Sequence, residues 1–145
     1  KIDLSCIPWA TFTDPEVASC GPNEGAAKKA GIQYDIAKFD FSHQDRALAE
    51  GENHGFIKVL LGKKKKVIGC QIVGPHAGEL IHEWIVGMSA GMKLSDMGSI
   101  THVYPTLAGA NKQVAGQYLG EGFLTPKTRK WTRKLLGLRN SKIDE

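Results

Sequence analysis

Two apolar stretches separated by four consecutive lysines constrain the fold of this chain more than any other sequence feature. In residues 55–62, Ile57, Val59 and Leu61 occupy every second position, and residues 67–74 alternate in the same way. A repeat of two is typical of strands that bury one face. The two stretches predict a β-hairpin with the lysines at its solvated tip, where charge discourages pairing with other strand edges. A nucleic-acid-binding patch is the alternative interpretation of the lysines.

The N-terminal part of the chain adds further elements to this hairpin. Residues 7–13 and 32–41 are rich in β-branched and aromatic side chains and predict two more strands. Residues 14–21 predict a turn or the start of a helix that ends at Gly21. Asn23 is a suitable cap for a short helix over residues 24–30, which ends at the following glycine.

Two longer helices follow the hairpin. A helix of about 16 residues is predicted after Pro75, with one apolar stripe at helical spacing. The stripe consists of Ile81, Trp84, Ile85, Met88 and Met92. A second helix is predicted from Thr106 to Gly120, with a hinge at residues 120–122 behind it. The expected fold class is α+β, an antiparallel sheet with flanking helices.

Neither a metal site nor a disulfide framework is expected. Glu79 and His82 have the spacing used in di-iron bundles, but the partner carboxylates on other helices are missing. The three cysteines, Cys6, Cys20 and Cys70, are an odd number and match no zinc-binding or redox spacing. This usage fits inert, buried thiols in a reducing cytoplasm.

The bulk composition fits one globular domain, because 145 residues with 41% hydrophobic and 23% charged side chains can form a core. No apolar run approaches the roughly 20 residues that cross a bilayer. The chain begins at Lys1, without a start methionine or signal-peptide pattern. We therefore expect a fragment of a longer protein that carries part of its function.

The positive charge is concentrated at the C-terminus. Residues 124–145 contain seven Lys and Arg against two Asp and Glu, whereas the charges of residues 1–123 nearly balance. Thr125 and Pro126 predict a helix start, and Trp131, Leu135 and Leu138 fall on one face behind it. This segment predicts a basic amphipathic tail. Docking on the protein itself or simple solvation is favoured, then an anionic membrane surface, with nucleic acid least favoured.

Residues 101–106 combine an aromatic hydroxyl with a proline before a predicted helix. Pro105 disfavours helix at Tyr104 and holds it extended. Thr106 is a plausible N-cap. The stretch predicts a rigid mount for Tyr104 beside the backbone N–H groups of a helix start. The alternative is a tyrosine that packs against the end of a strand.

Four stretches together resemble one family. They are residues 7–21 (IPWATFTDPEVASCG), residues 55–59 (GFIKV), residues 67–74 with 77–81 (VIGCQIVG and AGELI), and residues 102–107 (HVYPTL). In this order and spacing they resemble the C-terminal dimerisation domain of the pyridine nucleotide-disulfide oxidoreductases. The likeness runs from about residue 5 to 120. Its last motif falls where the family has His-x-His-Pro-Thr.

The resemblance implies a domain that makes a homodimer and closes the partner subunit's active site. In that family, the backbone around the Pro-Thr pair touches the partner's flavin. Tyr104, Pro105 and Thr106 are therefore expected to contact FAD of the partner subunit, with His102 supporting the loop. The FAD and NAD(P) domains lie upstream in the family, and this chain has no GxGxxG fingerprint. The fragment alone is expected to hold no cofactor and to be inactive.

The sequence departs from the family at the catalytic position. Tyr104 stands where the acid/base histidine is expected, and Gly109 stands where its glutamate partner is expected. A tyrosine titrates near a pKa of about 10, so it is a poor base at neutral pH. Tyr104 is the candidate catalytic residue by position only. The sequence thus predicts a dimerisation domain over residues 1–123 and a basic tail over 124–145, in a cytoplasmic protein that the tail could hold at a membrane surface.

Overall fold

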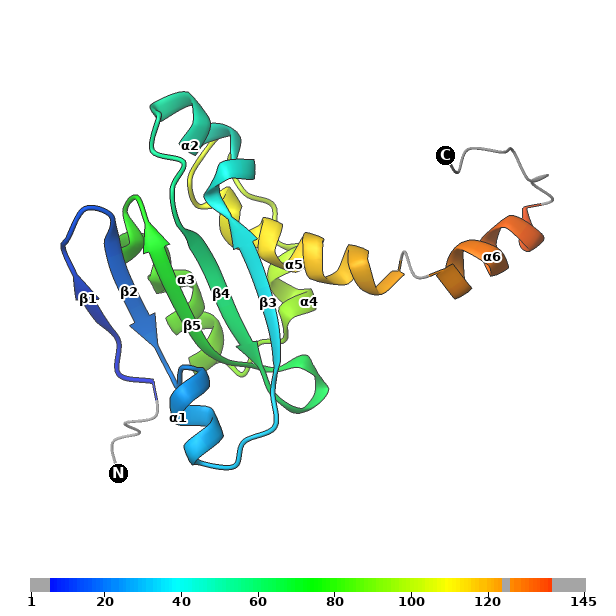
Figure 1. Cartoon of the computed structure of the whole chain (residues 1–145), viewed down its shortest axis with the longest axis horizontal. Coiled ribbons are helices and arrows are strands. Elements are labelled where there is room, and N and C mark those ends of the chain that lie inside the picture. The colour runs from blue at the N-terminus through cyan, green and yellow to red at the C-terminus, as the bar shows by residue number, and fades with distance from the viewer. Residues whose placement is uncertain (1–5, 124–125, 137–145) are drawn as a thin grey trace.

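The computed structural model describes residues 6–123 and 126–136. A five-stranded antiparallel sheet in the order β1-β2-β5-β4-β3 forms its centre (Figure 1). The strands are β1 (Trp9–Thr11), β2 (Glu16–Cys20), β3 (Asp35–Asp40), β4 (Phe56–Leu61) and β5 (Val67–Gly74). The predicted α+β class, an antiparallel sheet with flanking helices, is confirmed.

The hairpin predicted from the alternating pattern is formed by β4 and β5. Ile57 lies opposite Ile72, and Val59 lies opposite Cys70. The lysines form a 3-10 turn, η2 (Lys63–Lys65), at an exposed tip. The Lys65 ammonium donates to Asp35 Oδ2 at 2.6 Å and to Tyr118 Oη at 2.7 Å. The tip is therefore solvated, as predicted, and is also joined to β3 and to a helix.

Helices cover the two faces of the sheet unequally. In Figure 1, α3, α4 and α5 lie behind the sheet, α1 lies in front of its lower end and α2 lies near the upper end. α3 packs on β2 and β5, while α5 packs on β3 and β4. The helices are α1 (Glu24–Lys29), α2 (Asp45–Glu50), α3 (Ala77–Ser89), α4 (Leu94–Ser99), α5 (Gly109–Phe123) and α6 (Pro126–Leu135), with a 3-10 turn η1 (Phe41–His43) before α2.

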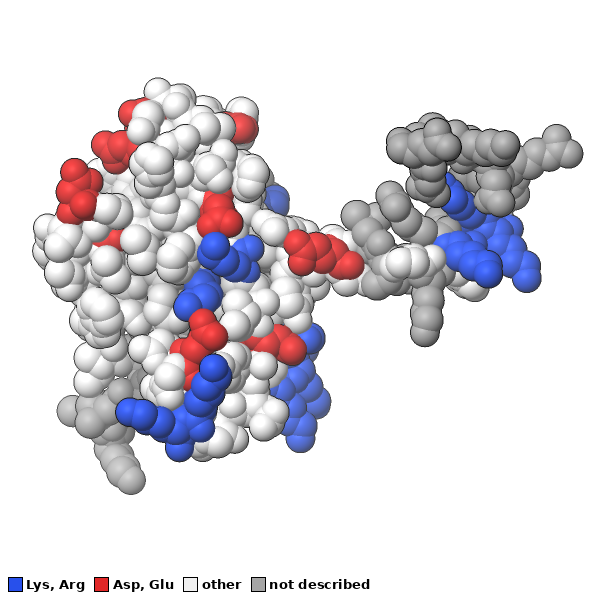
Figure 2. All heavy atoms as spheres, viewed as in Figure 1, with Lys and Arg blue, Asp and Glu red and all other residues white. Residues whose placement is uncertain are grey.

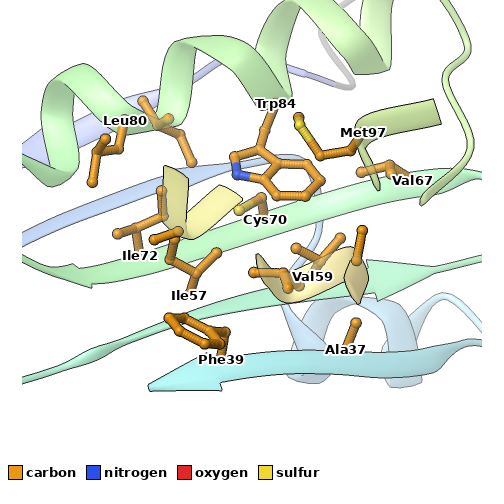
Figure 3. Close-up of a cluster of buried hydrophobic side chains, with 14 of the residues drawn as sticks. Ala37, Phe39, Ile57, Val59, Val67, Cys70, Ile72, Leu80, Trp84 and Met97 are labelled. Atoms are coloured by element: carbon orange, nitrogen blue, oxygen red, sulfur yellow. The ribbon is translucent and has the colours of Figure 1, made fainter. Parts of the chain in front are cut away.

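The core lies between the sheet and the helices α3, α4 and α5, and Figure 3 shows part of it. Three residues of the predicted apolar stripe, Ile81, Trp84 and Met88, are buried there, while His82 on the opposite side is exposed. α3 has 13 residues and ends at Ser89, so Met92 of the predicted stripe lies beyond the helix. The fully buried Trp84 indole points from α3 toward the strands. The apolar face of α3, whose residues recur every 3.6 positions, therefore packs against the apolar face of the strands, whose residues recur every two positions.

Two local predictions are wrong. Residues 16–20 form strand β2, not a turn or helix start, because β1 and β5 pair with it from both sides. α5 continues to Phe123, so residues 120–122 lie inside a helix and not in a hinge. The short helix capped by Asn23 is confirmed, since the Asn23 side chain accepts from the Ala26 amide at 2.9 Å.

α6 is the helical part of the basic tail. Trp131 and Leu135 are exposed on it, as is Leu136 behind its last residue. The predicted contribution of Leu138 lies outside the described residues. None of the helices in the described ranges is long and apolar enough to cross a membrane.

The buried thiols give a prediction on reactivity. Burial raises the pKa of Cys20 from 9.0 to about 12 and also raises the pKa of Cys70, its neighbour across β2 and β5. At about pH 8, the reactive thiolate of Cys20 is therefore about a thousandfold rarer than in the unfolded chain. We expect iodoacetamide to leave both residues unmodified in the folded protein and to label both in urea, as read by peptide mass spectrometry.

The same shift fixes the sign of a pH effect on stability. Folding favours the protonated Cys20 thiol. Its contribution to the free energy of unfolding is therefore fully present below the pKa of an unfolded cysteine, and it is lost as the pH rises through about 12. Fast labelling of Cys20 in the folded protein at neutral pH would contradict this interpretation.

Candidate functional site

The loop of residues 101–108 lies between α4 and α5 and passes beside α2 (Figure 1). α5 begins at Gly109, so the prediction of Thr106 as its N-cap is wrong. The Thr106 hydroxyl instead donates to the Val103 carbonyl at 2.7 Å. The Thr106 carbonyl accepts from the Gly109 amide at 3.1 Å. These two bonds fold the residues around Pro105 into a compact turn before the helix.

A partly buried polar network holds the first end of this loop. His102 Nε2 lies 3.1 Å from Glu83 Oε1 on α3, and it must carry the hydrogen because a carboxylate oxygen only accepts. Asn111 Nδ2 on α5 donates to the other oxygen of Glu83 at 2.5 Å. Asn111 Oδ1 accepts from the Trp84 indole at 2.7 Å. The network links α3, α5 and the loop at a point where Asn111 is fully buried.

α2 holds the other end of the loop. Gln44 is buried and precedes α2 as its N-cap, where its side-chain oxygen accepts from the Arg46 and Ala47 amides. Its Nε2 donates to the Thr106 carbonyl at 2.7 Å. One side chain therefore caps a helix and fixes the loop at the same time.

Tyr104 stands at the exposed crest of the loop. Its side chain is 78% exposed, as is that of Val103. The Tyr104 hydroxyl donates to Asp45 Oδ2 at 2.9 Å, and this bond to a carboxylate raises the pKa of Tyr104. A raised pKa keeps the phenol protonated at neutral pH. Tyr104 is therefore arranged to donate a hydrogen bond and to present an aromatic surface rather than to accept a proton.

Gly109 lies five residues after Tyr104 and has no titratable side chain. A Cβ built there would lie 3.5 Å from Gln44 Nε2, an ordinary contact, so close packing does not require glycine. Within the described residues, no cluster of three or more His, Cys, Asp or Glu could hold a metal ion. Glu79 and His82, whose spacing resembled a di-iron motif, are both exposed on α3.

Sequence reasoning placed His102, Tyr104, Pro105 and Thr106 on one loop, and the structure brings them together there. It missed the four residues that position the loop: Gln44, Asp45, Glu83 and Asn111. One signal was available in the sequence, because Asn111 lies among Leu107, Ala110 and Val114, which recur at helical spacing. The other three partners are polar residues in ordinary polar surroundings.

Comparison with known proteins identifies the family of this chain. Residues 7–115 match the family described as pyridine nucleotide-disulphide oxidoreductase, dimerisation domain. The chain belongs to this family. The match covers all five strands, α1 to α4, the loop and the first part of α5. The resemblance seen in the sequence motifs is thereby confirmed.

Relatives of this dimerisation domain include mitochondrial and archaeal enzymes. Dihydrolipoyl dehydrogenase of Caenorhabditis elegans is 38% identical over 113 residues, which are 77% of this chain and 23% of that protein. Dihydrolipoyl dehydrogenase 3 of Haloarcula marismortui is 39% identical over 115 residues, 79% of this chain and 24% of that protein. The chain thus spans about a quarter of the length of these relatives.

Solved structures show the same arrangement of elements. LpdA from Mycobacterium tuberculosis superposes with a TM-score of 0.74 at 25% identity, over 81% of this chain and 26% of that one. The flavoprotein disulfide reductase RclA from Escherichia coli shares the fold with a TM-score of 0.73 at 18% identity, over 77% of this chain and 26% of that one. The likeness is to the dimerisation-domain part of these proteins, about a quarter of each solved chain.

Proposed function

We propose that residues 1–123 pair two copies of an FAD- and NAD(P)-dependent oxidoreductase, and that the loop of residues 102–106 in one subunit covers the flavin of the other. The observation that carries the proposal is the mounting of this loop. Its two ends are fixed by His102 and Thr106, yet Val103 and Tyr104 between them are 78% exposed. An ordered loop with exposed apolar crest residues is suited to a contact outside the domain.

A second apolar surface supports pairing of two copies. An open groove of about 610 Å³ runs between α3 and α4, and its wall includes Val86, Ala90 and Ile100. Val86 is 67% exposed and Ile100 is 45% exposed. The groove adjoins the loop, since His102 and the groove residue Glu83 are bonded to each other. The proposed partner of this groove is the second copy of the chain.

The roles of the loop residues follow from their bonds. Pro105 and Thr106 present backbone toward the proposed flavin position, and His102 supports them through Glu83. Tyr104 contributes a hydrogen-bond donor and an aromatic wall, because its phenol stays protonated. The FAD and NAD(P) of the whole protein supply hydride and electron transfer, and this domain supplies positioning. The buried thiols Cys20 and Cys70 fit a reducing compartment, for which we propose the cytoplasm.

The test uses the protein in the full-length form in which it is encoded. Analytical ultracentrifugation is expected to give a dimer, and the visible spectrum is expected to show bound flavin. Val86→Glu places a charge in the groove and is expected to shift the protein toward monomer. Ile36→Glu is the matched control, since Ile36 is an exposed apolar residue on β3 away from the groove. A monomeric wild-type protein without flavin would contradict the proposal.

A further inference from the structure

The helix α6 has one basic and one apolar face. Residues Pro126–Leu135 contain five Lys and Arg and no Asp or Glu. Trp131 and Leu135 are four residues apart and share a face, Arg133 lies opposite that face, and Lys130 and Lys134 lie along its edge. The basic side chains form a cluster in Figure 2, separate from the mixed charges of the sheet domain.

The apolar face of α6 is uncovered by the described part of the chain. Trp131 is 66% exposed, Leu135 is 68% exposed and Leu136 is 61% exposed. Large exposed apolar side chains are unfavourable in water, so they gain free energy when another apolar phase covers them. The family match ends at residue 115, so α6 also lies outside the domain that accounts for pairing.

We propose that α6 lies on an anionic lipid surface. Trp131 and Leu135 enter the boundary between headgroups and acyl chains, while Lys130, Arg133 and Lys134 contact lipid phosphates. A helix of ten residues is about 15 Å long, too short to cross a bilayer and suited to lie in its plane. Charge complementarity supports this partner, because no acidic residue within α6 opposes its basic side chains.

A lipid surface fits this helix better than nucleic acid does. A phosphate backbone would engage only the basic face and would leave Trp131, Leu135 and Leu136 in water. A membrane interface satisfies both faces at once. The lysine-rich hairpin tip is a different surface, and its Lys65 is already paired with Asp35.

The experiment measures sedimentation of the full 145-residue chain with large unilamellar vesicles. One set is phosphatidylcholine alone, and the other contains about 30% phosphatidylglycerol to supply negative surface charge. Binding is expected only to the anionic vesicles, with a blue shift of tryptophan emission. Raising the salt to about 0.5 M is expected to weaken it, because salt screens surface charge. Equal sedimentation with both vesicle sets would overturn the proposal.

Matched variants separate charge from apolar contact. Lys130→Gln with Lys134→Gln is expected to lower the vesicle partition coefficient by about 25-fold, at about fivefold for each lysine. Lys28→Gln with Lys29→Gln removes the same charge from exposed positions on α1 and is expected to leave binding unchanged. Trp131→Ala with Leu135→Ala is expected to lower the partition coefficient by about tenfold or more. All six positions are exposed, so the fold is retained.

Two further results would overturn the proposal. If Trp131→Ala with Leu135→Ala leaves vesicle binding intact, the apolar face is not inserted in lipid. If this variant loses self-association in ultracentrifugation while vesicle binding is absent in the wild type, the face is a protein contact. Salt-sensitive binding of an RNA oligonucleotide without any vesicle binding would favour nucleic acid instead.

Discussion

Replacing Asn111 with leucine is expected to lower the free energy of unfolding by about 2–4 kcal/mol. Leucine has the same number and branching of side-chain heavy atoms as asparagine, so the change removes hydrogen bonds without creating a cavity. The buried Trp84 N–H loses its acceptor, and the Glu83 carboxylate loses a donor at 2.5 Å. An unsatisfied buried donor and a weakened charged bond are each costly. Urea unfolding followed by far-UV circular dichroism measures the change.

The control for Asn111→Leu lies on the same helix. Gln117 is exposed on α5, and Gln117→Leu is expected to change stability by less than about 0.5 kcal/mol. A double-mutant cycle with His102→Ala tests whether the two residues act through Glu83. Non-additive effects are expected, because both side chains bond to that one carboxylate. Strict additivity, or an Asn111→Leu variant as stable as the wild type, would contradict the network.

The elements that the sequence predicted correctly have a clear local period. The hairpin β4–β5 and the helix α3 follow from two-residue and 3.6-residue spacing, and both are confirmed. β2 was missed because its residues include small side chains of low strand propensity, such as Ala18 and Ser19. Its strand conformation comes from pairing with β1 and β5, which are distant in sequence or joined by a turn. Tertiary pairing therefore overrides local preference there.

The sequence likewise predicts one part of the candidate site and misses another. The loop residues could be found because they are contiguous and match a family motif. Their supporting partners could not, since Gln44 is 62 residues from Thr106 and Asp45 is 59 residues from Tyr104. A glutamine before a short helix is ordinary in sequence, and only the folded chain shows that its amide reaches the loop. The sequence thus predicts the residues of the loop more readily than the long-range contacts that hold the loop in place.

Gln44→Ala is expected to lower the free energy of unfolding by about 1–3 kcal/mol, because one residue caps α2 and binds the Thr106 carbonyl. Gln44→Ser separates the two roles. A serine still accepts from the first amides of the helix, but it is too short to reach Thr106. We expect this variant to recover about 1 kcal/mol of the loss in urea unfolding. The remaining difference from the wild type measures the bond to the loop.

The same pair of variants tests the link between loop position and function. If the loop covers the partner's flavin as proposed, both Gln44→Ala and Gln44→Ser raise the rate of flavin release from the full-length protein, since both lose the Thr106 contact. Gln117→Ala on the exposed face of α5 is the control and is expected to leave that rate unchanged. Faster release in Gln44→Ala alone would place the effect in the cap of α2. Unchanged release in both variants would show that the bond from Gln44 does not position the loop over the flavin.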